Sequence, residues 1–157
     1  MTSRLIWKTV ATQMDDETLL DQLSREAFER VDQLGNDPML LDEPWKTIVL
    51  IHSAQGVIDN GGFAYFFEND WPHFTPYEEF ARAYDRIGKS ESGTALRDAV
   101  SAMGLESPEH SLEARRHYIA TNQIDARGRI KGWDEAAVVG DSTVWAALAA
   151  WIRCLRV

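Results

Sequence analysis

Cysteine is almost absent from this chain of 157 residues, and long hydrophobic runs are missing. The single cysteine, Cys154, excludes an internal disulfide, so a reducing compartment is the simplest expectation. Its apolar surroundings predict that it packs and is not a nucleophile. The most apolar run, residues 144–152, is far shorter than the roughly 20 residues that a membrane-spanning helix needs. The apolar stretch at residues 5–7 is too short for a signal peptide. We therefore expect a soluble, cytoplasmic protein.

Basic residues are also scarce, with 16 Lys and Arg against 25 Asp and Glu, which gives a formal net charge of -9. Ten of the acids lie within residues 13–43, where Arg25 and Arg30 are the only basic residues. This charge disfavours direct binding of nucleic acid, because such binding depends on Lys and Arg that neutralise phosphates. It favours encounter with a basic protein surface. Acidity that only keeps the protein soluble is the alternative interpretation.

The apolar periodicity predicts an all-α fold, a single compact domain over residues 1–157 with about six to seven helices. Residues 15–35 place their apolar side chains on one face, and Gly35 suits the end of that helix. Residues 44–58 have little polar face, which predicts a buried central helix. Residues 1–14 are expected to be an N-terminal extension, as a short strand over 4–11 or an extended arm. Further helices are predicted over 76–88, from Ser90 or Ser92 to Met103, from Ser107 onward, and from Asp141 to the C-terminal end.

The acids of residues 15–43 are the candidate partner-binding residues. Most of them fall on the polar face of the first predicted helix, opposite its apolar stripe. Arg25 lies four residues from both Asp21 and Glu29, which is also typical of an ordinary solvated face with ion pairs. The candidate acidic face comprises Asp15, Glu17, Asp21, Glu26, Glu29, Asp32, Asp37, Asp42 and Glu43.

Half of the sixteen aromatic residues lie between Phe63 and Phe80, directly after a pair of glycines. Glycine pairs allow backbone conformations that other residues resist, and aromatic side chains offer large areas to bury. The segment therefore predicts a break after the central helix, followed by a short element packed into the core. A small-molecule pocket lined by these aromatics, with His73 and Tyr77 as polar groups, is an alternative.

Residues that could carry catalysis or bind a metal form weak patterns only. Glu106, His110, Glu113 and His117 follow a spacing of four, three and four residues, which predicts one helix face and could hold a metal. A solvated face with local ion pairs to Arg115 or Arg116 is favoured over that site. His52, among apolar neighbours, is interpreted as a core residue. No nucleophile motif or phosphate-binding loop is present, so we expect no enzyme, catalytic residue, metal or cofactor.

One short motif carries a resemblance to a known family. Asn60, Gly61, Gly62 and Phe63, followed by Phe66, Phe67 and Asn69, resemble the Asn-Gly-Gly-Phe signature of a bacterial family of small acidic helical proteins that includes DNA mimics. The family often has Gln where Tyr65 stands. The resemblance implies an all-α fold and, for the DNA-mimic members, an acidic dimer that occupies the DNA-binding face of a transcription factor. The motif itself is interpreted as structural, because mimicry of DNA would depend on surface carboxylates.

These observations together predict a non-enzymatic acidic binding protein. Its expected partner is a basic protein surface, such as the DNA-binding face of a transcription factor or of another nucleic-acid-binding protein, and it could act as a homodimer. An immunity-type protein that neutralises a basic toxin would need the same acidic face, so it stays an alternative. A small-molecule-binding helical domain that uses residues 63–80 is the other alternative.

Overall fold

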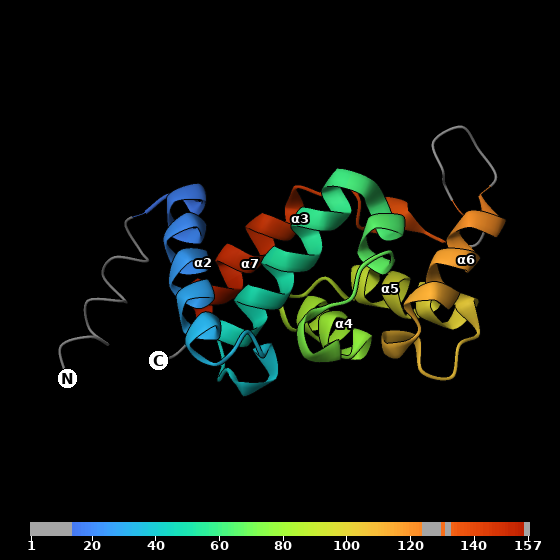
Figure 1. The fold of residues 1–157 in the computed structure, drawn as a ribbon. Coiled ribbons are helices and arrows are strands. Elements are labelled where there is room, and N and C mark those ends of the chain that lie inside the picture. Colours follow the sequence, from blue (N-terminus) through green and yellow to red (C-terminus); the bar gives the residue numbers. More distant parts are fainter. Residues whose placement is uncertain (1–13, 124–129, 131–132, 156–157) are drawn as a thin grey trace.

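Helices make up every named element in the computed structural model, which describes residues 14–123, 130 and 133–155 (Figure 1). An isolated antiparallel bridge also joins Gln123 to Ile130. The all-α prediction is thus confirmed, whereas the predicted strand at 4–11 lies outside the described residues. No helix among those described is long and apolar enough to cross a bilayer. The α-helices are α2 (Asp16–Gln33), α3 (Trp45–Phe67), α4 (Tyr77–Arg86), α5 (Ser90–Met103), α6 (Leu112–Asn122) and α7 (Thr143–Cys154).

Helix α2 begins and ends much as the sequence predicts. The side chain of Asp15 accepts a hydrogen bond from the backbone N–H of Thr18, which satisfies one of the free amides of the first turn. At the other end, Gly35 adopts a φ of 70° directly after the C-cap residue. The apolar stripe packs on α3 and α7, and it consists of the buried residues Leu19, Leu20, Leu23, Ala27 and Val31.

Helix α3 is the central element, and it is longer than the sequence predicts. We expected a helix over 44–58 that stops at the glycine pair, but α3 continues to Phe67 across a kink. Gly61 and Gly62 have non-helical dihedrals, with Gly62 at φ 67° and ψ -164°. The chain therefore changes direction at the predicted place and then resumes its helix. Most of the first half of α3 is buried, in agreement with the predicted central helix.

The second half of α3 enters an aromatic cluster. Phe66 contacts four rings, with centroid distances from 4.9 Å to Trp71 up to 5.6 Å to Tyr77. Because the rings fill the space between α3 and α4, this packing argues against a small-molecule pocket built from residues 63–80. His73 does not serve such a pocket, since its Nε2 lies 2.7 Å from the carbonyl oxygen of Gly35. The fully or almost fully buried members of the cluster are Phe63, Phe66, Phe67, Tyr77 and Phe80.

The α-helices are arranged along the length of the molecule, with different helices at its two ends (Figure 1). Figure 1 shows α2 and α7 beside the first half of α3, and α6 at the opposite end of the molecule. Helices α4 and α5 pack against each other between these ends.

Cys154 lies at the end of α7 and is exposed. The prediction that it packs into the core was therefore wrong: its neighbour Ile152 takes the buried position on this turn of the helix.

Candidate protein-binding surface on helix α2 and the adjoining groove

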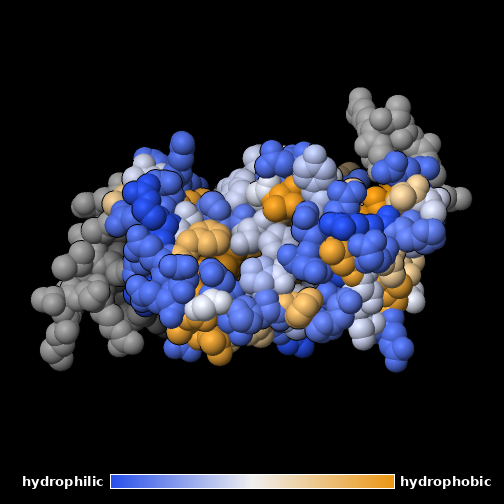
Figure 2. Space-filling view, in the orientation of Figure 1, coloured by the Kyte–Doolittle hydropathy of each residue, from blue (hydrophilic) through white to orange (hydrophobic). Residues whose placement is uncertain are grey.

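The structure brings the predicted acidic residues onto one continuous segment, namely α2 and the turn that follows it. Seven of the nine are exposed, whereas Glu26 and Asp37 are half-buried. The apolar stripe of α2 fixes this orientation, since burying that stripe against α3 and α7 turns the opposite face to solvent. Figure 2 shows a mostly hydrophilic surface over this part of the molecule, interrupted by hydrophobic side chains. Phe28 of α2 is 40% exposed.

Several of the predicted acids already have partners within the protein. Asp21 lies 2.7 Å from Arg25, and Glu26 lies 2.6 Å from Arg30, both one turn along α2. Glu43 pairs with Arg86 of α4 at 2.9 Å. Such exposed pairs contribute little stability, but they reduce the charge that a partner meets.

Two further acids act as caps of helices. Asp15 accepts from Thr18 at the start of α2, and this bond lowers the pKa of the Asp15 carboxyl below its ordinary value. Asp37 accepts from the backbone N–H of Met39 at the start of the short helix Pro38–Leu40. Their carboxylates are therefore tied to the backbone of the protein.

Four of the predicted acids face solvent without an ion pair in the described part of the chain. Within the described ranges, Glu17, Glu29, Asp32 and Asp42 are exposed and take part in no ion pair. Glu29 and Asp32 are three residues apart on α2, so they lie on the same face. These four residues are the unneutralised part of the predicted acidic face.

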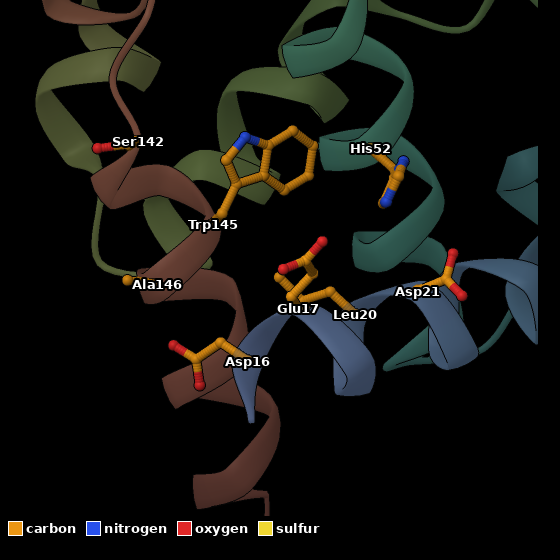
Figure 3. Close-up of a pocket in the computed structure, with 8 residues that line it drawn as sticks. All are labelled: Asp16, Glu17, Leu20, Asp21, His52, Ser142, Trp145 and Ala146. Carbon is orange, nitrogen blue, oxygen red and sulfur yellow. The ribbon is translucent and has the colours of Figure 1, made fainter. Parts of the chain in front are cut away.

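A groove adjoins this face where α2, α3 and α7 meet. It has a volume of about 530 Å³, and its lining is mainly apolar. Trp145 of α7 and His52 of α3 contribute rings whose centroids lie 5.0 Å apart (Figure 3). The ring centroid of Phe28 of α2 lies 6.1 Å from that of His52, so His52 contacts aromatic rings of both neighbouring helices. The groove is lined by Asp16, Glu17, Leu20, Asp21, His52, Ser142, Trp145 and Ala146.

His52 is a half-buried groove residue and not the core residue that its apolar neighbours in sequence predict. Its burial lowers the pKa of the imidazole below the ordinary value, and the charge of Asp21 opposes this shift only in part. The ring is therefore neutral at pH 7. Sequence reasoning missed the groove, because its lining comes from three helices that are far apart in the chain.

The glycine motif stands outside this surface, at the kink of α3. The backbone N–H of Phe63 donates to Glu135 Oε1 at 2.7 Å, which satisfies an amide that the kink frees from the helix. A Cβ on Gly62 would lie 2.5 Å from the same Glu135 oxygen, and a Cβ on Gly61 would lie 2.1 Å from the ring of Tyr65. The close approach explains why glycines stand here. The amide of Asn60 donates to the Gly56 carbonyl at 2.6 Å.

Arg115 holds the end of the aromatic segment, although the sequence offered it only as a surface ion-pair partner. Its side chain is fully buried, and its Nε donates to the carbonyl of Phe67 at 2.8 Å. Further bonds from the guanidinium reach the carbonyls of Pro108 and Asn69 and the carboxylate of Asp70. A cation here suits the negative C-terminal end of α3.

The spacing of Glu106, His110, Glu113 and His117 does not produce one helix face. His110 ends a short 3-10 helix, Pro108–His110, and α6 begins after it at Leu112, so only Glu113 and His117 share a helix. The ring of His110 lies 4.4 Å from that of Phe74. No group of three or more potential metal ligands occurs among the described residues. Glu113 forms the kind of local ion pair that the sequence analysis favoured over a metal site, since it pairs with Arg116 at 3.3 Å.

The fold and the surface together define an acidic all-α protein with a charged helix beside an aromatic groove. Comparison with protein families finds a match: the family described as DMP19-like protein matches residues 39–155. The chain therefore belongs to the DMP19-like family. No curated protein and no solved structure matches it significantly. The matched range contains the α3 and α7 sides of the groove, whereas α2 lies before its start.

Proposed function

We propose that this protein is a non-enzymatic acidic binding protein that uses the outer face of α2, together with Asp42 beyond its C-terminal end, to bind a basic protein surface. The observation that carries the proposal is the set of four exposed carboxylates without ion-pair partners in the described structure, Glu17, Glu29, Asp32 and Asp42. Carboxylates of this kind are available to the Lys and Arg side chains of a partner, and they accelerate its approach.

We further propose that the partner is a DNA-binding protein whose basic face α2 occupies in place of DNA. The DMP19-like family, to which the chain belongs, is a family of DNA mimics. Acids one turn apart on a helix lie about 5–6 Å from each other, close to the spacing of phosphates along a strand. Because α2 is anchored by its buried stripe, it presents these charges on a rigid frame and not on a flexible tail.

Affinity capture from a lysate of the native host tests the proposal. The intact protein serves as bait at low and at high salt, and mass spectrometry identifies what it retains. We expect a basic DNA-binding protein at low salt, and we expect it to be lost at high salt because salt screens exposed charges. Reversal of Glu29, Asp32 and Asp42 to Lys should abolish its capture.

The matched control reverses Asp98, Glu106 and Glu113 to Lys. These acids are equally exposed, but they lie on or near α5 and α6, away from α2 (Figure 1). Both triple variants have the same net charge, so a loss confined to the α2 variant assigns binding to that face. Equal capture by both variants would contradict the proposal. Capture of a basic toxin instead of a DNA-binding protein would replace mimicry by neutralisation at the same face.

A further inference from the structure

The groove between α2, α3 and α7 offers an environment suited to one kind of side chain. Its floor is apolar and includes Leu20 and the indole of Trp145, while carboxylates of α2 stand along one edge. An apolar floor alone would suit a hydrophobic ligand, and carboxylates alone would suit any cation. A flat cation on a hydrophobic stem satisfies both features, and among the side chains this describes arginine.

The three carboxylates of the groove are not equivalent. Asp16 forms an ion pair with Arg153, and Asp21 forms one with Arg25. Glu17 is exposed and, in the described part of the chain, has no ion-pair partner. Figure 3 shows its carboxylate reaching from α2 toward Trp145, across from His52. An incoming cation would thus meet an unneutralised carboxylate directly beside an aromatic ring.

We propose that this groove receives an arginine side chain of the basic partner, with its guanidinium stacked on Trp145 and paired with Glu17. The inference rests on the proposed function, since it names the side chain that the partner inserts. A guanidinium is planar and weakly hydrated, so it stacks on indole rings more readily than an ammonium group does. The complementary charge of Glu17 supplies direction, and the volume of about 530 Å³ accommodates the whole side chain.

His52 does not oppose this occupant at neutral pH. The rings of Phe28 and Trp145 lie against the His52 ring, and the charge that acts on it is that of the Asp21 carboxylate. Since burial keeps the imidazole neutral at pH 7, the net charge of the groove stays negative. Protonation of His52 at lower pH would add a like charge beside the bound guanidinium and weaken its binding.

Titration with a minimal probe tests the proposal on the full chain. N-acetylarginine amide is added to isotope-labelled protein, and the indole N–H signal of Trp145 is followed by NMR, assigned through its loss in Trp145→Phe. The probe should shift this signal saturably. The citrulline counterpart, which has the same shape without the charge, should not. Glu17→Gln should weaken the arginine probe about fivefold. Trp145→Leu, in which the ring signals of His52 report binding in place of the lost indole, should weaken it about tenfold or more.

Glu106→Gln is the matched control, because Glu106 is an exposed acid outside the proposed binding face that does not line the groove. It should leave the affinity of the probe unchanged. No shift at Trp145, an equal shift with citrulline, or an equal effect of Glu17→Gln and Glu106→Gln would overturn the proposal. Glu17→Gln is a surface change, so its result does not depend on whether Trp145→Leu folds.

Partner capture separates this inference from the proposed function. If the Lys variant of Glu29, Asp32 and Asp42 loses the partner while Glu17→Gln and Trp145→Leu keep it at full affinity, the acidic face stands and the arginine site fails. If no variant affects capture, both fail. If Glu17→Gln and Trp145→Leu each weaken capture by the factor seen with the probe, the arginine site is supported.

Discussion

The buried guanidinium of Arg115 lies 2.7 Å from the carboxylate of Asp70, across 45 residues of sequence. The same side chain donates to carbonyls at the end of α3, including that of Phe67. Replacing Arg115 by Met should lower the free energy of unfolding by about 2–3 kcal/mol, because it leaves the buried carbonyl of Phe67 without a donor and removes the bonds to partly buried oxygens. Urea unfolding followed by circular dichroism measures this change.

Arg116 supplies the control for that experiment. It neighbours Arg115 in sequence, but its side chain is 50% exposed and pairs with Glu113. Arg116→Met should change the unfolding free energy by about 1 kcal/mol or less. Equal losses for the two variants would mean that the burial of Arg115 adds nothing to the free energy of unfolding.

Two glycines with positive φ predict different responses to alanine. Gly35 has a φ of 70° and open space where a Cβ would lie, so Gly35→Ala should cost about 1 kcal/mol of unfolding free energy. Gly62 combines φ 67° with ψ -164°, a region almost restricted to glycine, and its Cβ would meet Glu135. Gly62→Ala should therefore cost about 3 kcal/mol or more. Thermal unfolding of both variants checks the difference, and similar losses would contradict the described kink.

His52 predicts a pH dependence of stability near neutrality. Its folded pKa is lowered by burial, so below its ordinary value of 6.5 the unfolded chain binds more protons than the folded one. The stability linked to His52 is therefore complete above that value and decreases as pH falls below it. His52→Gln should flatten the pH profile of unfolding in this range.

The carboxylate of Asp21 opposes the shift at His52. Asp21→Asn should therefore lower the His52 pKa further, as measured by an NMR titration of the ring protons. An unchanged pKa in the variant would show that the field of Asp21 does not reach the ring.

Asp141 predicts a second pH effect, in acid. Lys89 lies 2.7 Å from its carboxylate and, with Thr143, lowers the pKa of Asp141 below its ordinary value of 3.8. The stability that this carboxylate contributes is present above that value and is lost as pH falls through the lowered pKa. Asp141→Asn should lose less stability between about pH 5 and pH 2 than the unaltered protein. Thermal unfolding curves of both proteins over this pH range test the prediction. Equal losses of stability in the two proteins would contradict a stabilising ion pair between Lys89 and Asp141.

The sequence predicted helices well where the signals are local. The apolar stripe of residues 15–35 and the cap at Asp15 correspond closely to α2, and glycine ends mark α2 and α5 as expected. Ser90 begins α5 as one of the two predicted starts. The break at Gly61 and Gly62, followed by a short element packed into the core, was also predicted. The contact between the Phe63 amide freed by the kink and Glu135, 72 residues away, was not.

The features missed by sequence reasoning all depend on contacts between distant segments. In the sequence, nothing distinguishes Arg115 from a surface arginine. In the structure, its guanidinium donates to the carbonyls of Phe67 and Asn69, which lie more than 40 residues away. The groove needs His52 and Trp145 side by side, and no spacing along one helix predicts that approach. The ion pair between Glu43 and Arg86 could not be predicted either, because the two residues are far apart in the chain.

Helix α2 packs mainly on α3 and α7, whereas the aromatic cluster lies beyond the kink at Gly62. The side chains that would choose a partner are therefore different from those that hold the cluster together. Under the proposed function, substitutions on the outer face of α2 and at Trp145 would change what the protein recognises without repacking Phe66 and its neighbours. The fold would thus allow its specificity to diverge while its aromatic core stays the same.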